Sequence, residues 1–396
     1  MEKKVSRRRR TLQQWLRDEK WTCIVLLAAV LVFAAARIWA AEEPESDTST
    51  ATEYAEYETG VIQQILSDNT ESDPTADGGY RGEQMLTVEI TSGRYKGETL
   101  QVYNYVGPLY GVPLGEGDGC TLIISTYDDG SHTATVYEYN RAMPLLIVMA
   151  LFLIVTIAVG GKTGLKSLVG LLVTLACLFL VLIPMLMKGL PTLPTVFLVC
   201  AYVAVVSLTI LGGVQRKTVC AMLGTIAGTA LALVFGLVAQ AITRIDGLRI
   251  SDVEPLLQLR QQGMPIGLRG LLVGGVIISA LGAVMDVTMG IASSLSEVHE
   301  ANPSLTRKEI FRSGMNIGRD MVGTMTNTLI LAFIGSGFTL ILYLYSLGLS
   351  FHQLLSSSYL SLEVVSGISS SVGVILSIPL TALVSAVLLT KQSEKK

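Results

Sequence analysis

The sequence predicts an α-helical polytopic membrane protein with about eight transmembrane helices and a small extracytoplasmic β domain after the first helix. Three observations lead to this fold class. Half of the 396 residues are hydrophobic, 15% are charged, and the mean hydropathy is +0.53. Apolar runs of about 20 residues recur along the chain, separated by polar joints. Residues 41–141 differ, because they hold 19 Asp and Glu against four Lys and Arg.

The N-terminus predicts a first membrane span that enters from the cytoplasm. Residues 1–20 form a basic cytoplasmic segment, and residues 21–40, WTCIVLLAAVLVFAAARIWA, are an apolar run of the length that the hydrocarbon core requires. A cleaved signal peptide is the alternative, because Ala34 and Ala36 offer a small-x-small site after the run. Either interpretation leaves the topology of the later segments unchanged.

Residues 41–141 predict a polar region outside the membrane. Residues 41–80 are acidic and rich in Ser, Thr and Glu, so we expect a disordered stalk that buries little apolar surface. In residues 81–141, TVEITSGRYKGETLQVYNY and CTLIISTYDDGSHTATVYEY alternate Val, Ile, Tyr and Thr, which predicts an antiparallel β domain with DDG as the clearest hairpin turn. Cys120 is the lone cysteine of this region, which excludes a disulfide framework and a CxxC metal site there.

Seven further apolar runs predict a transmembrane bundle at residues 142–390, followed by a cytoplasmic tail at 391–396. Lys and Arg favour the cytoplasmic side, and the segments placed inside by this count, which include both termini, carry 19 of the 29 Lys and Arg residues. The joint 243–269 fits least well, since it carries four Arg on the predicted outer side. The runs are residues 143–160, 167–187, 192–211, 218–241, 270–293, 317–346 and 366–390.

Two joints carry signals for helix starts. In SDVEPLLQLRQQG, Ser251 and Glu254 have capping-box spacing and Gly263 can end the segment, which predicts a short helix at the membrane interface. In TRKEIFRSG, Thr306 and Glu309 repeat that spacing on the inner side. We expect this second segment to be an elbow that turns the chain back into the bilayer.

Small residues predict where helices approach one another closely. Gly224, Gly228 and Gly236 in AMLGTIAGTALALVFG lie on one helix face, with Ala232 between them, and allow another backbone to come near. Such contacts require no function beyond packing. Three glycines of later helices, to which we also assign helix packing or bending, are Gly282, Gly290 and Gly323.

The run SALGAVMDVTMGIASSLSEV places a carboxylate inside an apolar segment. Its small and polar residues are three or four positions apart and therefore share one helix face; they are Ser279, Gly282, Asp286, Gly290, Ser293 and Glu297. An ionised carboxylate near the centre of an isolated transmembrane helix costs about 2.5 to 3.5 kcal/mol on insertion scales. We therefore expect Asp286 to face the helix bundle or a water-filled cavity and not lipid.

The next two helices supply polar groups at similar spacing. In SGMNIGRDMVGTMTNTLILAFIGSG, Asn316 and Asp320 begin a stripe with Arg319 beside it, and in the last helix Glu363 begins a stripe of Ser and Gly. These stripes predict a polar seam through the C-terminal helices. Its ion- or substrate-path residues are Asp286, Ser293, Glu297, Asn316, Arg319, Asp320, Thr324, Asn327 and Glu363.

Three stretches resemble the YibE/F family of bacterial membrane proteins: the run ending in SSLSEV, then NIGRDMVGTMTNTLILAFIGSG, then SSSVGVILSIPLTALVSAVLL. RYKGETLQVYN and VGGKTGLKSLVGLLVTL are also similar to that family, so the resemblance runs from about Gly93 to the C-terminus. It implies a multi-pass protein, described as a membrane protein or permease, with an outer domain ahead of the main bundle. It supplies no substrate. The motif positions that it covers are Asp286, Ser293, Ser294, Glu297, Asn316, Gly318, Arg319, Asp320, Gly323, Thr324, Asn327 and Glu363.

These patterns favour a membrane transporter or permease, coupled to protons or cations, in which Asp286 is the protonatable or ion-binding group. The structural alternative is a fixed ion pair of Asp286 with Arg319 inside the bundle. A second function class is a non-transporting anchor, sensor or assembly partner that acts through its acidic outer domain. We expect no enzyme, because the aspartates of neighbouring helices lack the Gly-x-Gly-Asp surroundings of an intramembrane aspartic protease, Ser336 has no intramembrane His, and HExxH spacing is absent. The absence of a P-loop argues against transport driven by ATP within this chain.

The same observations imply partners and a location. The partners are the lipid bilayer and an unknown small solute or ion, with a homo-oligomer or a related membrane chain as a further association. We expect no cofactor, no metal and no nucleic acid. The location is the cell membrane, with both termini cytoplasmic and residues 41–141 extracytoplasmic.

Overall fold

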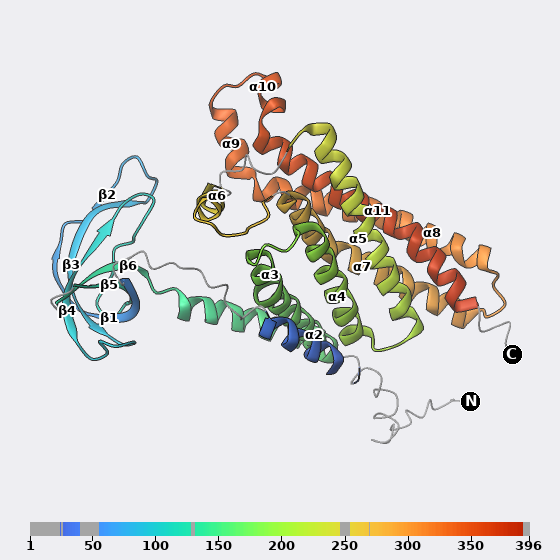
Figure 1. Cartoon of the computed structure of the whole chain (residues 1–396), viewed down its shortest axis with the longest axis horizontal. Coiled ribbons are helices and arrows are strands. Elements are labelled where there is room, and N and C mark those ends of the chain that lie inside the picture. Colours follow the sequence, from blue (N-terminus) through green and yellow to red (C-terminus); the bar gives the residue numbers. More distant parts are fainter. Residues whose placement is uncertain are drawn as a thin grey trace, which may run out of the picture. The chain divides into compact units, whose positions relative to one another are not determined.

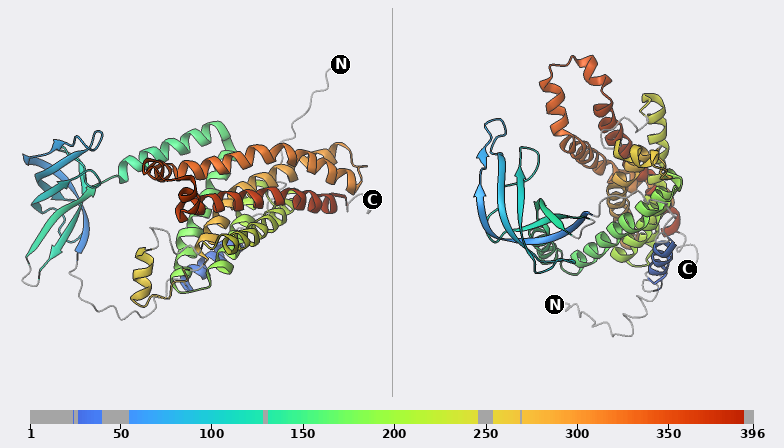
Figure 2. Two further views of the ribbon diagram at one scale, coloured as in Figure 1. Left: turned by 90° about the horizontal axis from the view of Figure 1, so that it is seen from above. Right: turned by 60° about the vertical axis from the view of Figure 1, so that its left-hand side comes forward.

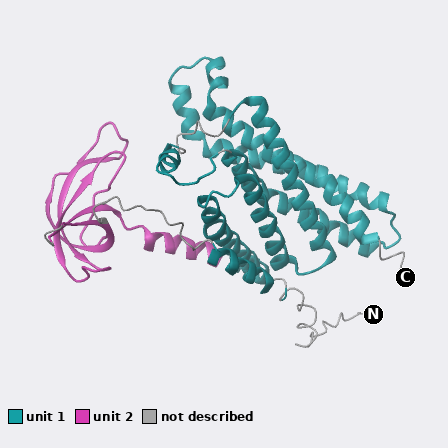
Figure 3. Cartoon of the chain, viewed as in Figure 1, with its two compact units in different colours: residues 1–44, 156–396 teal, residues 45–155 magenta. Residues whose placement is uncertain are grey.

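The computed structural model describes residues 24, 27–39, 55–127, 131–245, 254–268 and 270–390. The chain forms two compact units, which are residues 45–155 and residues 1–44 together with 156–396 (Figure 3). The first of these, residues 45–155 (magenta, unit 2 in Figure 3), holds the described strands, and the second (teal, unit 1 in Figure 3) holds a bundle of helices. The long helix α2, Ala142–Cys177, starts in the first unit and ends in the second.

Five strands of the first unit close into a barrel (Figures 1 and 2). They are β1 (Ala55–Asp68), β3 (Tyr80–Ile90), β4 (Thr99–Val106), β5 (Gly119–Thr126) and β6 (His132–Tyr139), with the short β2 (Glu71–Ser72) beside β3. The order around the barrel is β1-β5-β6-β4-β3, and β3 pairs with β1 to complete the ring. Among these pairings, β4 with β6 is parallel and the others are antiparallel. Numbered along the chain, the five barrel strands follow the order 1-2-3-5-4-1, the topology of the OB-fold.

Alternate strand residues fill the barrel interior, as the two-residue period of a strand requires. The two hairpins expected around residues 87–105 and 120–139 are confirmed as β3–β4 and β5–β6. The DDG turn itself lies outside the described residues. The largest fully buried side chains of this core are Ile62, Leu86, Ile90, Leu122 and Ile124.

Two buried amides hold the loop between β4 and β5 against the barrel. Asn104 Nδ2 donates a hydrogen bond to Gln84 Oε1 at 2.9 Å, and the same oxygen accepts one from the Leu114 backbone N–H at 2.9 Å. Gln84 Nε2 donates to the Asp68 carboxylate at 2.9 Å. Because buried polar groups need partners, this network fixes the loop as well as the two strands.

The predicted disordered stalk is wrong for residues 55–80, which belong to the barrel. β1 pairs along its first half with β5 and along its second half with β3, so the whole strand is paired. These pairings, together with burial of Ile62, offset the conformational entropy that an acidic segment loses on folding. Residues 41–54 lie outside the described residues.

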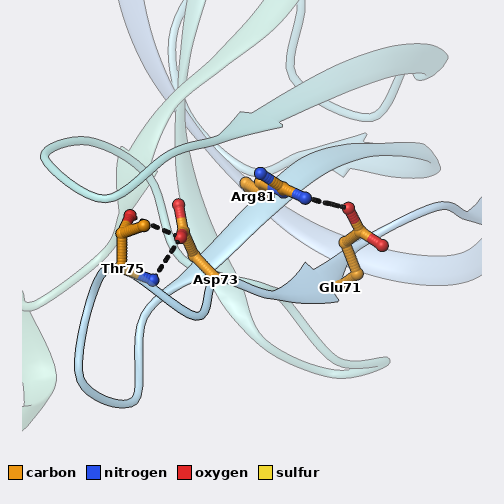
Figure 4. Close-up of polar contacts among 4 residues, drawn as sticks. All are labelled: Glu71, Asp73, Thr75 and Arg81. Carbon is orange, nitrogen blue, oxygen red and sulfur yellow. Dashed lines mark hydrogen bonds and ion pairs between the residues drawn. The ribbon is translucent and has the colours of Figure 1, made fainter.

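Local polar contacts order the turn between β2 and β3 (Figure 4). The Asp73 carboxylate accepts hydrogen bonds from the Thr75 backbone N–H at 2.8 Å and from its hydroxyl at 2.6 Å. Arg81 forms an ion pair with Glu71 at 2.8 Å, with both side chains more than half exposed. An exposed pair of this kind adds little stability, so the turn depends mainly on the Asp73 contacts.

The second unit is a bundle of helices (Figure 1). Its long helices are α4 (Thr192–Gly212), α5 (Arg216–Thr243), α7 (Leu271–Ala301), α8 (Arg307–Ser336) and α11 (Ser358–Thr390). Its short segments are the π-helical turn Leu178–Leu182, α3 (Ile183–Met187), α6 (Glu254–Gln261), α9 (Phe338–Ser346) and α10 (Phe351–Ser356).

Several described helices have the length and composition of membrane spans, which agrees with a membrane protein that carries a small β domain. Five helical segments of the described chain are long and apolar enough to cross a bilayer, and α8 with α9, bent by 59°, makes a sixth if the pair is one span. A shorter apolar helix, Leu27–Trp39, occupies part of the first predicted span. The count of eight stays a prediction.

One of the five segments, Ala142–Met187, is broken at Gly161. Gly161 has φ 54° and ψ −133°, a backbone conformation that side chains rarely adopt. Gly164 lies against the backbone carbonyl of Thr156, although eight residues of straight helix would separate them by about 12 Å. The chain therefore turns sharply in the GGKTGLK joint that separates the predicted runs 143–160 and 167–187.

The centre of the bundle is formed by α5, α7 and α11, and glycines bring α5 close to its neighbours (Figure 1). A Cβ placed on Gly228 would lie 2.5 Å from Ser377 Cβ of α11 and 3.0 Å from Val284 Cγ1 of α7. One turn earlier, Gly224 lies against Thr381 of α11. These glycines leave no room for a side chain, so they set the distance between the helices.

Both predicted joints are helical. The joint 243–269 contains α6. The joint before α8 starts that helix with the predicted capping box, in which Thr306 Oγ1 accepts from the Glu309 N–H and the Glu309 carboxylate accepts from the Thr306 N–H. The joints therefore set the directions of the helices that follow them.

The helix Leu27–Trp39 packs on the bundle through the Tyr202 hydroxyl, which donates to the Ala29 carbonyl at 2.6 Å.

Candidate functional site

The polar stripe of α7 lies on the outer surface of the bundle. Gly282, Asp286 and Glu297 are exposed, while Gly290 and Ser293 are half-buried. The opposite side of α7 is fully buried among α5, α8 and α11. In a single chain Asp286 therefore does not face the bundle interior, contrary to the expectation from its cost in lipid.

The outward side of α8 is polar as well. Gly314 and Gly318 face α11, where Ala382 and Ile378 fill the space next to them. At about 100° per residue, the exposed polar and small residues of α8 cluster within about 140° of the helix circumference, away from that contact. They are Asn316, Arg319, Asp320, Gly323, Thr324 and Asn327, all exposed.

Two contacts fix the register between α7 and α8. Leu295 of α7 lies 3.0 Å from a Cβ placed on Gly314 of α8, and Met321 of α8 lies 3.2 Å from a Cβ placed on Gly290 of α7. Residue numbers fall on α7 as they rise on α8, so the helices are antiparallel, and Asp286 is level with Thr324.

The exposed residues of the two stripes thus lie at matching depths on neighbouring helices, and we call them together the α7–α8 polar face. The register also adds Thr328, an exposed residue level with Gly282 that the sequence analysis missed, although its four-residue spacing from Thr324 was a usable signal. The face consists of Gly282 and Asp286 on α7 and of Asn316, Arg319, Asp320, Gly323, Thr324, Asn327 and Thr328 on α8.

The predicted alternative, an ion pair between Asp286 and Arg319, is not found among the ion pairs of the described residues. Helix geometry gives the reason. Arg319 precedes Met321, the α7 contact, by two residues, which is a rotation of about 200° around α8. The Arg319 side chain therefore leaves α8 on the side that is turned away from α7.

The α11 stripe has a different environment. Ser370, Gly373 and Ser377 are buried, and a Cβ placed on Gly373 would lie 2.6 Å from Ala232 Cβ of α5. Ser370 links this stripe to α7, because its hydroxyl lies 3.0 Å from the Ser279 hydroxyl and donates to the Val276 carbonyl at 3.4 Å. The three stripes thus divide into a packing interface on α11 and an exposed polar face on α7 and α8, instead of forming one seam.

Glu363 lies apart from the polar face, behind the bend between α8 and α9. It lines a pocket of about 220 Å³ with Phe333, Ile334 and other apolar side chains, and it lies 3.4 Å from a Cβ placed on Gly337 at the bend. No hydrogen bond or ion pair is found for it in the described part of the chain. The other side chains that line this pocket are apolar, so the pocket offers the Glu363 carboxylate no polar side chain as a partner.

The α7–α8 polar face combines two carboxylates, a guanidinium, two amides and two hydroxyls. Carboxylates bind protons or cations, and amides and hydroxyls both donate and accept hydrogen bonds, so the face can bind a cation or a polar solute. The described residues contain no group of three or more His, Cys, Asp and Glu that could hold a metal ion. Ser293 and Glu297 continue the stripe toward the end of α7.

Apolar helices of spanning length and an appended β barrel define the class of this chain as a membrane protein. Residues 148–391 match the model of a family described as YibE/F-like protein, and because this is more than half of the chain, the protein belongs to that family. The barrel lies outside the matched residues, so the similarity of RYKGETLQVYN is not part of the match. Comparisons with curated proteins and with solved structures find no match.

Proposed function

We propose that this chain is a multi-pass protein of the cell membrane with eight spans. The spans are the helix containing Leu27–Trp39, the two segments on either side of Gly161, α4, α5, α7, the bent pair α8–α9, and α11. An even number of spans puts both termini on the same side, and the distribution of Lys and Arg makes that side the cytoplasm. Residues 41–141, with the barrel, are then extracytoplasmic.

The function that the site supports best is transport of a small solute or ion by a permease coupled to protons or cations. One observation carries this proposal: Asp286 is near the middle of an apolar helix, exposed on a polar face, and without an ion pair among the described residues. A carboxylate in hydrocarbon costs about 2.5 to 3.5 kcal/mol, and a purely structural role would be expected to recover that cost through a partner.

Asp286 has the central role in this proposal. It gains and loses the proton or cation, and the hydroxyl of Thr324, level with it on α8, binds the solute. The α8–α9 bend at Gly337 supports the proposal, since broken helices are typical of transporters that open alternately to either side.

The test compares solute and ion contents inside and outside cells that lack this protein and are complemented with wild type, Asp286→Asn or Glu300→Gln at equal membrane levels. Glu300 is an exposed acid on the same helix, three turns or more beyond Asp286, so its amide variant controls for the loss of one negative charge. We expect wild type and Glu300→Gln to restore the distribution of one solute, and Asp286→Asn not to restore it. Equal restoration by all three proteins would contradict the coupling role.

A specific observation supports the second function class, an anchor or sensor that binds through its outer domain. Ten of the 14 Tyr lie in residues 54–139, and several project from the barrel wall. Tyr57 and Tyr137 meet edge to face at 5.2 Å, and the rings of Tyr103 and Tyr105 are 6.0 Å apart. Exposed tyrosines favour binding, because each offers an apolar ring and a hydroxyl.

The two functions make opposite demands on the chain. An anchor or sensor requires its barrel and tolerates Asp286→Asn, whereas a carrier requires Asp286 for transport. A phenotype that follows barrel surface changes such as Tyr103→Ser with Tyr105→Ser, and that Asp286→Asn leaves unchanged, would favour the second function.

A further inference from the structure

The α7–α8 polar face presents a solvation problem whether or not the protein transports anything. In a single chain this face is part of the bundle's outer surface, so lipid would contact Asp286 near the middle of the apolar helix α7, while Arg319 and Asp320 lie at the start of the predicted run 317–346. Lipid chains offer no hydrogen bonds to these groups. The outward residues of α5 and α11 are different, since Val234, Leu376 and Leu383 are aliphatic and suited to lipid. Something other than lipid must cover the polar face.

We infer that a second copy of this chain covers it, and that two copies associate through their α7–α8 polar faces about a two-fold axis normal to the membrane. Charge is the first argument for this occupant. Arg319 and Asp320 are consecutive and therefore at nearly equal depth, and two copies inserted in the same orientation bring Arg319 of each opposite Asp320 of the other. The charges of the polar face on one copy therefore complement the charges of the same face on the other copy.

Hydrogen bonding is the second argument. Asn316 and Asn327 each carry both donors and acceptors, so each can pair with the same residue of the other copy across a two-fold axis. An apolar helix would leave the Asn327 amide, which lies inside the predicted run 317–346, without a partner. A chemically similar face is required at the same depths, and a second copy supplies one.

Close approach is the third argument. A Cβ placed on Gly323 or Gly282 would meet nothing within 4 Å, in contrast to Gly228, which is enclosed by α7 and α11. Two of the glycines assigned to helix packing are therefore unused within one chain. Small residues on an outward helix face let a second backbone approach, and here they lie among the polar groups that need cover.

The first experiment maps the interface by cross-linking in intact membranes. Gly323→Cys in the full-length chain is treated with a short bifunctional thiol reagent, beside wild type and Leu383→Cys, which places the same thiol on the aliphatic outward side of α11. We expect a covalent dimer with Gly323→Cys, and neither with wild type nor with Leu383→Cys. A dimer only with Leu383→Cys, or no dimer with Gly323→Cys in chains that are labelled by a monofunctional thiol reagent, would overturn the inference.

A charge exchange tests the pairing itself. Two differently tagged chains are co-expressed, one carrying Arg319→Asp and the other Asp320→Arg, so that one face has two acids and the other two bases at these positions. We expect each variant to fail to co-purify with its own kind and to co-purify with the other at the wild-type level. Self-association of either variant at the wild-type level would refute the Arg319–Asp320 pairing.

The membrane level of each variant and its elution profile separate misfolding from lost association. The inference does not depend on transport, so the outcome for Asp286→Asn leaves it untouched. A chain that is monomeric when counted in native membranes would overturn it even if transport were established.

Discussion

The packing of α5 against α7 and α11 allows a quantitative prediction at Gly228. In Gly228→Ala the new methyl group would lie 2.5 Å from Ser377 Cβ, whereas ordinary contact begins at 3.4 Å, so the helices must separate by about 0.9 Å. Ser377 Cβ is attached directly to the backbone, so rotation of the side chain gives no relief. Overpacking of this kind costs about 1 to 3 kcal/mol.

Gly275→Ala is the matched control, because Gly275 lies inside α7 and a Cβ there would meet nothing within 4 Å. Ala is favoured over Gly within a helix by about 1 kcal/mol at both sites, so this contribution cancels when the two variants are compared. The free energy of unfolding of Gly228→Ala should therefore be about 1 to 3 kcal/mol below that of Gly275→Ala. Thermal unfolding in a single mild detergent, followed by size-exclusion chromatography of the soluble fraction, measures the order of the two. Equal midpoints, or a lower midpoint for Gly275→Ala, would refute the packing argument.

Three further predictions concern the barrel and the inner elbow. Hydrogen bonds from the Thr70 hydroxyl and backbone, and then from Gln84, lower the pKa of Asp68, so the stability that they provide is present above the ordinary value of 3.8 and is lost as the pH falls through the lower folded value. Acid titration of barrel circular dichroism should show a weaker dependence in Thr70→Val, and an unchanged curve would contradict this. Burial raises the pKa of the Cys120 thiol to about 11, so maleimide should label it slowly at pH 7 in the folded protein and rapidly after denaturation; equal rates would be inconsistent with its burial. Thr306→Ala removes the α8 cap and should cost about 1 kcal/mol, measured as a lower thermal midpoint than that of Ser304→Ala, outside the helix.

The barrel shows which parts of the fold could be predicted from the sequence. The hairpins β3–β4 and β5–β6 were predictable because their residues alternate regularly and their turns contain Gly. β1 was missed for two reasons. Its acids suggested disorder, and its register shifts near Gln63 and Leu66 interrupt the two-residue period by which a strand is recognised. Closure of the ring by β1 and β3 is a long-range pairing that no local pattern encodes.

The candidate site was predictable in part, for a related reason. Periodicity grouped Asp286 with the glycines and serines of α7, and Asn316 with Asp320 and Asn327 of α8. Periodicity defines a face but not its direction, which depends on the tertiary contacts that pin the opposite side of each helix. Leu295 against Gly314 and Gly318 against Ile378 are such contacts, and they turn the polar stripes outward. The sequence alone allowed an ion pair of Asp286 with Arg319 on neighbouring helices. The pair does not form because the Arg319 side chain leaves α8 on the side turned away from α7.

Gly228 and Gly323 have different structural roles in this bundle. The difference depends on the side chains that surround each glycine in the fold and not on the local sequence. Gly228 recurs every four residues with Gly224 and Ala232, and α11 fills the space beside it with Ser377. Gly323 is also set in a polar stripe of small residues, yet nothing of its own chain comes within 4 Å of where its Cβ would be. A glycine that is enclosed already has its partner, whereas an exposed glycine among charged groups at membrane depth still requires one. Substituting Ala at Gly228 should therefore destabilise the single chain, and substituting Leu at Gly323 should leave the single chain folded and weaken its association with a second copy.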